Sequence, residues 1–182
     1  MSLNTEREGA DVEAVAGLAD ATGADVLVLP ETTQRYGRRL AEALTELKKS
    51  GAQPSSFEVF SDTGMLSDLV EQGIDQNSDP AYSTTVLVAS LCRRPPAGLI
   101  VAGDFNATRD HAPLRNLGGC ISAGEQAGIG GLATWPSSTG TTLLGATIDH
   151  IFVDGTVWEG KGGRIITIPG TDHRAVVVQL SD

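Results

Sequence analysis

The stretch LIVAGDFNATRDH, residues 99–111, begins as an apolar run and changes character at Gly103. Its first residues favour a buried strand, because aliphatic and β-branched side chains pack well on a pleated surface. Asp104 and Asn106 follow where the apolar run ends. Gly103 permits close backbone approach, and residues two apart in an extended segment point to the same side. The stretch therefore predicts a strand that aims a carboxylate and a carboxamide at one place.

Helical patterns and further apolar runs surround this strand. Residues 10–21 and 33–50 place apolar side chains at helical spacing, and a glycine follows each segment as a stop signal. The second segment turns Tyr36, Leu40, Leu44 and Leu47 inward. We expect other strands at 24–30, 57–60, 84–90, 147–155, 164–170 and 173–180, and an irregular loop at 118–146. Such a mixture predicts sheets packed face to face and flanked by helices.

Length and charge exclude several classes of protein. The chain has 182 residues, of which 40% are hydrophobic, and this suffices for one domain with its own core. The net charge of −10 excludes the basic stripe of a non-specific nucleic-acid binder, so a nucleic-acid substrate would need a bound cation.

Targeting signals and cysteines give little information about the location of the protein or about a metal site. The chain lacks an apolar membrane span and a signal-peptide pattern, so we expect it to be soluble. Residues 1–3 either belong to the protein or are an expression scar, and the sequence does not favour one over the other. In the second case the chain is a domain excised from a membrane or exported protein. Cys92 and Cys120 lack the spacing of a zinc site, and the sequence leaves open whether they pair or lie separately in the core.

Four carboxylates share one context, at or near the ends of apolar strands. They are Glu31, Asp104, Asp149 and Asp172. Each alone is compatible with a simple turn former, but together at one sheet edge they would repel unless a cation were bound or protons were taken up. Oxygen ligands with few histidines favour Mg²⁺, Mn²⁺ or Ca²⁺ over zinc. His173 follows Asp172 directly, and a histidine held by an aspartate makes a general base or a cationic stabiliser.

Four motifs in this order resemble the endonuclease/exonuclease/phosphatase superfamily, the metal-dependent phosphodiesterases that include deoxyribonuclease I. They are LPET at 29–32, GDFN at 103–106, IDHIF at 148–152 and TDHRAVV at 171–177. The resemblance implies an α/β (α+β) fold, a four-layer α/β/β/α sandwich, with residues 1–182 as a single domain. It further implies an enzyme that uses Mg²⁺, Mn²⁺ or Ca²⁺ and water to hydrolyse a phosphodiester or phosphomonoester. Nucleic acid and lipid head groups both remain open as substrates, and we expect a monomer.

The resemblance also assigns roles to individual residues. The catalytic residues are Asp104, Asn106, Asp149 and His173. The metal ligands are Glu31, Asn4 and Asp172, and the substrate contacts are Asn106, Trp135 and Arg109. The sequence leaves open whether Asp104 or His173 takes the proton of the attacking water.

One family feature is missing from the chain. Family members carry a histidine-bearing strand before the GDFN strand, whereas this chain has only LCRRPPAG at 91–98. Either a true deletion leaves an impaired domain with a binding or structural role at the cell envelope, or a segment near residues 90–93 is missing from the sequence. The other two histidines have plainer readings: we expect His111 at the surface and His150 packed or at solvent.

Overall fold

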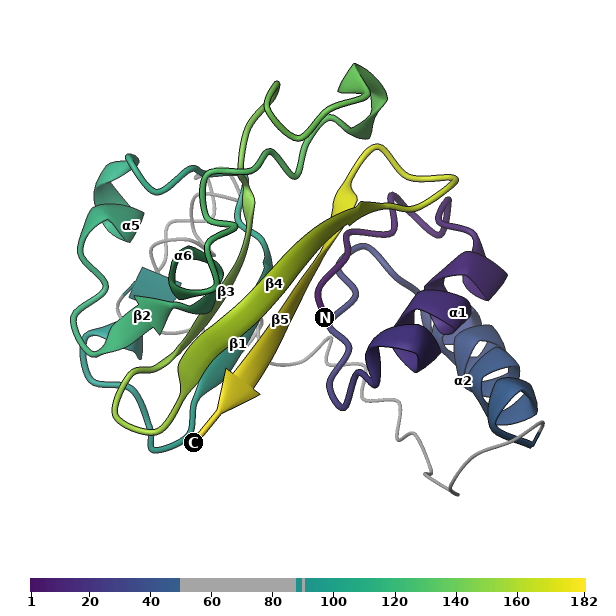
Figure 1. The fold of residues 1–182 in the computed structure, drawn as a ribbon, viewed down its shortest axis with the longest axis horizontal. Coiled ribbons are helices and arrows are strands. Elements are labelled where there is room, and N and C mark those ends of the chain that lie inside the picture. Colours follow the sequence, from purple (N-terminus) through teal and green to yellow (C-terminus); the bar gives the residue numbers. More distant parts are fainter. Residues whose placement is uncertain (50–87, 90) are drawn as a thin grey trace, which may run out of the picture.

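The computed structural model describes residues 1–49, 88, 89 and 91–182 (Figure 1). Its helices are α1 Val12–Thr22, α2 Gln34–Lys49, α5 Ala112–Arg115 and α6 Ala123–Gln126, with one 3-10 turn, η1 Ser137–Thr139. Its strands are β1 Ile100–Asp104, β2 Cys120–Ser122, β3 Asp149–Asp154, β4 Glu159–Thr167 and β5 Arg174–Ser181. The strand predicted at 57–60 lies outside the described residues.

The two long helices form where the periodicity predicts them. The carboxylate of Asp11 accepts a hydrogen bond from the Ala14 amide and caps α1, which ends at Gly23 in the left-handed conformation. In α2, the inward positions Tyr36, Leu40 and Leu44 are buried as predicted. The prediction for Leu47 is wrong: it is 39% exposed, because the last turn of α2 lies outside the core cluster that buries the other three.

The strand register of the first sheet places two of the predicted catalytic residues next to each other. This sheet has the order β1-β3-β2, and all of its pairs are antiparallel. β1 and β3 pair so that Gly103 lies opposite His150 and Asp104 lies opposite Asp149. Directly opposed residues of an antiparallel pair have neighbouring side chains. The pairing therefore brings together two carboxylates that are far apart in the sequence.

The second sheet pairs β4 with β5, and the first residues of the chain extend its edge. Ser2 forms an antiparallel bridge to Val176 and a parallel bridge to Val28. The predicted strand at 24–30 is thus reduced to one bridge, because in the described chain this segment pairs only with residues 1–5. The same pairing places Asn4 and Glu31, each just beyond a bridged residue, at one end of the sheet.

Two further predictions need correction. Val88 and Ala89 are helical, so the strand predicted at 84–90 does not reach them, and residues 84–87 and 90 lie outside the described chain. The predicted loop at 118–146 contains β2, α6 and η1. β2 exists because it pairs with β3, as in Ser122 opposite Phe152, and a local sequence pattern does not reveal such a long-range pairing.

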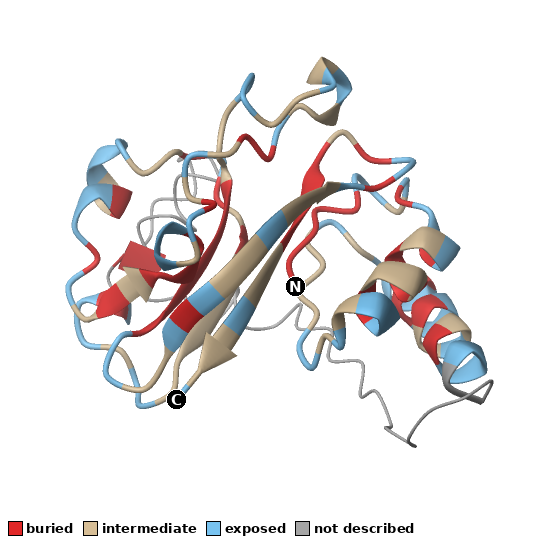
Figure 2. Cartoon of the chain, viewed as in Figure 1, coloured by how far each residue is buried: buried red, intermediate tan, exposed pale blue. Residues whose placement is uncertain are grey.

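Three apolar clusters define the layers (Figure 2). One lies between the α1/α2 pair and the second sheet, and another lies between the two sheets. The third covers the outer face of the first sheet with Leu114 of α5 and with Cys92, which forms a disulfide with Cys120. Helix, sheet, sheet and helix thus follow one another, which confirms the predicted deoxyribonuclease I-like α/β fold. None of the described helices has the length and apolar character needed to cross a membrane.

Candidate active site

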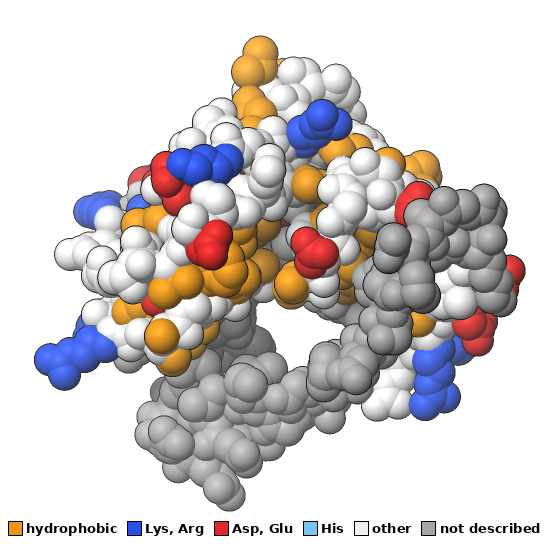
Figure 3. Space-filling view, turned by 60° about the horizontal axis from the view of Figure 1, so that its bottom comes forward, with side chains coloured by type: hydrophobic (Ala, Val, Ile, Leu, Met, Phe, Trp, Pro, Cys, Tyr) orange, Lys and Arg blue, Asp and Glu red, His pale blue; other side chains and the backbone are white. Residues whose placement is uncertain are grey.

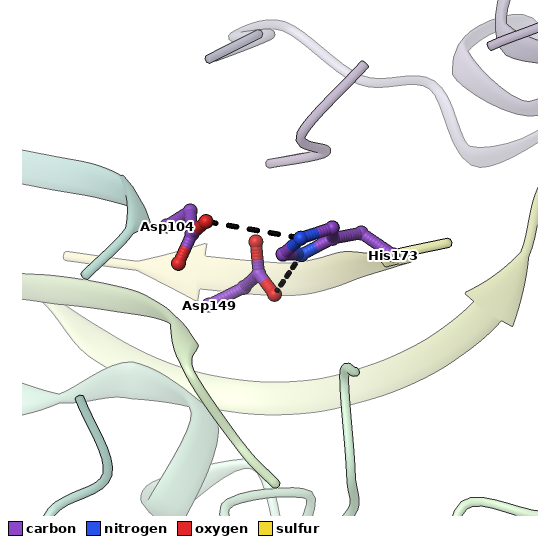
Figure 4. A group of neighbouring side chains, drawn as sticks. All are labelled: Asp104, Asp149 and His173. Atoms are coloured by element: carbon purple, nitrogen blue, oxygen red, sulfur yellow. Dashed lines mark hydrogen bonds and ion pairs between the residues drawn. The ribbon is translucent and has the colours of Figure 1, made fainter. Parts of the chain in front are cut away.

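Two aspartates and a histidine meet at the end of the first sheet (Figure 4). Asp104 ends β1, Asp149 begins β3, and His173 immediately precedes β5. The Nδ1 atom of His173 lies 2.9 Å from Asp149 Oδ2, and its Nε2 atom lies 3.8 Å from Asp104 Oδ2. One ligand atom from each of the three residues lies within 4.8 Å of the others. The histidine is therefore held by one carboxylate and faces the other.

Asn4 connects this trio to Glu31. Its Nδ2 group donates to Asp104 Oδ2 at 3.0 Å and to Glu31 Oε1 at 3.2 Å. Its Oδ1 atom accepts from the amide of Glu6, and its backbone carbonyl accepts from Thr171. The structure thus brings two predicted metal ligands beside the predicted catalytic residues.

Asn106 reaches the site by a route that differs from the prediction. The residue has a φ of 47°, so the backbone turns sharply after β1 and does not remain extended. Its amide donates to Asp104 Oδ1 at 2.8 Å, and its side-chain amide lies 3.4 Å from Asp104 Oδ2. A tight turn and not strand alternation therefore places the carboxamide beside the carboxylate.

Asp172 lies beside the Nε2 atom of His173 as well, and it contacts Trp135. Asp172 Oδ1 is 3.7 Å from His173 Nε2, and Asp172 Oδ2 accepts from the indole N–H of Trp135 at 2.7 Å. The backbone amide of Asp172 donates to Glu6 Oε2. Trp135 is 39% exposed, so the predicted substrate contact lies at the rim of the site.

The remaining candidates are engaged elsewhere. Arg109 forms an ion pair with Glu125 at 3.0 Å and also donates to the carbonyl of Leu114. Its predicted contact with a phosphate stays a prediction. As expected, His111 is exposed, while His150 is buried with its Nε2 atom 2.8 Å from the carbonyl of Ala107.

The pKa values of Asp104 and His173 both lie above their ordinary values, for different physical reasons. Burial raises the pKa of Asp104, and the charge of Asp149 adds to this, while the Asn106 amide opposes it. Burial lowers the pKa of His173, but the hydrogen bond and charge of Asp149 and the charges of Asp104 and Asp172 outweigh it. The pKa of His173 therefore lies above its ordinary value, and protonation of the imidazole is favoured.

The donor set fits a divalent cation. Carboxylates of Asp104, Asp149 and Asp172 surround a single imidazole, and Glu31 is linked to Asp104 through Asn4, so negative charge exceeds positive charge. Asp149 Oδ1 is buried and has no hydrogen-bond partner among the described residues. Hard carboxylate and amide oxygens are the ligands of Mg²⁺, Mn²⁺ and Ca²⁺. Asp104 and Asp149 could hold such an ion, because their ligand atoms lie within 4.8 Å of each other and of His173. Glu31 and Asp172 are the further ligands that the family motifs predict.

The sequence analysis missed three residues that hold the side chains or backbone of the candidate site in place. The hydroxyl of Thr134 accepts from the amides of Ile148 and Asp149, Glu6 holds the Asp172 amide, and Thr171 holds Asn4. Thr171 is the first residue of the TDHRAVV motif and Thr134 directly precedes the predicted substrate contact Trp135, and these positions were the available signal. Glu6 offered none, because its role depends on a contact with residue 172 across the fold.

The hydrogen bond between Asp149 and His173 predicts a measurable effect on the imidazole. In Asp149→Asn, we expect the pKa of His173 to fall, because the variant removes the negative charge that favours the imidazolium. A raised histidine pKa stabilises the folded state at pH values below the ordinary histidine pKa, and that stability is lost as the pH rises through the raised value. The variant should therefore show a smaller loss of stability over this window.

An NMR titration of the His173 ring protons measures this shift in the metal-free protein. Asp154→Asn is the matched control, because Asp154 is also a buried aspartate of β3 but bonds to Gly98 and Thr156 at the opposite end of the strand. An unchanged His173 titration in Asp149→Asn would show that the pair does not form in solution.

Comparison with known proteins places this site in a family. A family model described as "Endonuclease/Exonuclease/phosphatase family" matches residues 1–173. The chain therefore belongs to the endonuclease/exonuclease/phosphatase family, as the order of its motifs predicts.

Two solved structures from Bacteroides thetaiotaomicron are similar to the chain. One is a mannosyl-6-phosphatase, with 21% identity and a TM-score of 0.40, covering 56% of this chain and 46% of that chain. The other is an endonuclease/exonuclease/phosphatase family protein, with 21% identity and a TM-score of 0.42, covering 55% of this chain and 43% of that chain. The chain thus matches less than half the length of either, and neither indicates its substrate. No curated protein matches the chain significantly.

Proposed function

We propose that this chain is a metal-dependent phosphoesterase that hydrolyses a phosphodiester, or secondarily a phosphomonoester, by attack of water at phosphorus. The observation that carries the proposal is the position of His173, which Asp149 holds at 2.9 Å and which faces Asp104 at 3.8 Å. The link from Asp104 through Asn4 brings a further carboxylate, that of Glu31, to the same edge and supports its proposed role as a metal ligand. Family membership supports this choice of chemistry.

We assign each residue a role in the reaction according to its charge. A phosphate ester repels nucleophiles, so catalysis depends on neutralising charge and on aligning water with the leaving oxygen. The raised pKa of Asp104 suits it to accept the proton of the attacking water, and the raised pKa of His173 suits it to stay protonated beside the phosphate. Asn106 can hold a phosphate oxygen without adding negative charge. A divalent cation held by Glu31, Asp104 and Asp172 would supply Lewis acidity when bound.

Hydrolysis of bis(p-nitrophenyl) phosphate tests the proposal. We expect p-nitrophenolate release in the presence of Mg²⁺, its loss on chelation with EDTA, and its recovery when excess Mg²⁺ or Mn²⁺ is added. The monoester p-nitrophenyl phosphate should be hydrolysed more slowly. Absence of metal-dependent release with Mg²⁺, Mn²⁺ and Ca²⁺ from both substrates would overturn the proposal.

One observation favours a second candidate, an impaired member of the fold with a binding or structural role. The chain has three histidines, and His111 and His150 are engaged away from Asp104, so the family's other histidine has no counterpart among the described residues. Binding of Mg²⁺ or inorganic phosphate, seen by calorimetry without any turnover, would support this candidate.

The net charge supports a proposal about the class of substrate. The net charge of −10 disfavours a polyanionic substrate, and basic side chains lie separately on the face in Figure 3. We therefore propose a lipid head group ahead of DNA, and parallel assays with phosphatidylcholine vesicles and plasmid DNA distinguish them.

The Cys92–Cys120 disulfide supports an extracytoplasmic location, because disulfides persist in oxidising compartments. We propose that the protein acts there as a monomer.

A further inference from the structure

Arg174 has a buried guanidinium and no ion-pair partner among the described residues. It is 1% exposed and heads the fully buried side chains in volume. It follows His173 and begins β5. Burial of a charge is costly unless hydrogen bonds compensate for it. The partners of the guanidinium therefore indicate what this side chain does.

All the recorded partners of the guanidinium belong to one loop, residues 133–141. Nη1 donates to the carbonyl of Ala133 at 2.9 Å. Nη2 donates to the carbonyls of Ser137 and Thr141 at 3.2 and 3.1 Å, and to the hydroxyl of Thr139 at 2.8 Å. The backbone amide of Arg174 also donates to the carbonyl of Thr134. A single side chain thus fastens the whole loop to the start of β5.

This loop carries two residues that contact the aspartates on either side of His173. The indole of Trp135 donates to Asp172 Oδ2 at 2.7 Å. The hydroxyl of Thr134 accepts from the backbone amide of Asp149 at 3.1 Å. The Asp172 side chain is 44% exposed, so the protein surface alone does not fix its rotamer. Its direction depends on Trp135, and the position of Trp135 depends on the loop.

We propose that Arg174 is a positioning residue that holds the 133–141 loop and thereby directs the second oxygen of Asp172 toward the site. The proposal rests on the proposed function for its effect on turnover, but its structural part holds independently. With Oδ2 bound to Trp135, Oδ1 of Asp172 lies 3.7 Å from His173 Nε2, the same atom that faces Asp104.

Lysine cannot replace arginine in this role. The planar guanidinium presents donors along different directions, and here two nitrogen atoms reach oxygens of four different residues. A lysine ammonium offers its donors from one atom. Arg174→Lys therefore keeps the positive charge but should release part of the loop.

The test measures the environment of Trp135 together with turnover. The chain has two tryptophans, so Trp158→Phe leaves Trp135 as the single tryptophan, which excitation at the red edge of the absorption band selects over the tyrosines. In this background we expect Arg174→Lys to increase acrylamide quenching of Trp135 and to shift its emission to the red. Asp172→Ala should produce the same optical change. On bis(p-nitrophenyl) phosphate, kcat should fall by about 10-fold to 100-fold, because small displacements in a site are costly.

Arg164→Gln is the matched control, because Arg164 is an exposed arginine on the neighbouring strand β4, and it should change neither signal. If Arg174→Lys does not fold, Thr139→Val removes one acceptor of the guanidinium and should give the same changes in milder form. Unchanged Trp135 quenching in a folded Arg174→Lys or Thr139→Val variant overturns the proposal. If the parent protein lacks turnover, the proposed function fails, and the fluorescence result alone still decides the role of Arg174.

Discussion

Replacement of Asp104 with asparagine should reduce Mg²⁺-dependent hydrolysis of bis(p-nitrophenyl) phosphate by about 10²-fold to 10⁴-fold, the range attributed to a positioned acid or base. The carboxylate accepts from Asn4 and the Asn106 amide and faces His173, so it can serve both the water and the cation. An amide keeps the shape of the group but accepts no proton and binds a divalent ion weakly.

The same variant should not weaken the fold in the absence of metal. Burial raises the pKa of Asp104, which means that ionised Asp104 is less favourable in the folded chain than in the unfolded chain. For a raised carboxyl pKa this cost is present at pH values above the raised pKa and disappears as the pH falls below it. Asp104→Asn should therefore have an equal or higher Tm at neutral pH.

Asp20→Asn, an exposed change on α1, serves as the control for both measurements and should match the wild type. Turnover by Asp104→Asn within threefold of the wild-type rate would remove Asp104 from the proposed chemistry. A large loss of Tm would instead make its role structural.

Removal of the Cys92–Cys120 disulfide should cost about 3 to 4 kcal/mol of unfolding free energy, from the chain entropy of a closed loop of this size. The bond joins residues separated by 28 positions, and both cysteines are buried in the cluster on the outer face of the first sheet. It fastens the Cys92 segment to β2, and the amide of Gly119, directly before β2, also donates a hydrogen bond to the Cys92 carbonyl.

Urea denaturation of Cys92→Ala/Cys120→Ala against the oxidised wild type measures this difference. Reduced wild type should resemble the double variant, which separates loss of the crosslink from loss of sulfur packing. A change below about 1 kcal/mol would show that the crosslink contributes little, since a typical disulfide contributes 2–4 kcal/mol.

Local patterns predicted the elements that depend on near neighbours. Helices α1 and α2, β1, β3 and β5 form close to where periodicity or apolar runs place them. The strand predicted at 164–170 is confirmed only in part, because β4 covers Glu159–Thr167 and its first residues form a strand by pairing with β5. The predictions failed where strand pairing between distant residues decides the secondary structure. Residues 24–30 form one bridge, Val88 and Ala89 are helical, and β2 lies inside a segment predicted as loop.

The candidate site shows the same division. The residue types were visible in the sequence, and the family motifs named Asp104, Asp149 and His173 together with Asn4 and Glu31. The contacts of Glu6 and the loop held by Arg174 were not visible, because they join residues more than thirty positions apart.

The sequence by itself determined the family, the order of its motifs and the apolar strands that end in polar residues. Only the tertiary structure decided that Asp104 lies opposite Asp149, that His173 enters between them, and that Cys92 pairs with Cys120. The physical reason is that propensity and periodicity act over a few residues, whereas strand register and side-chain proximity depend on the packing of the whole chain.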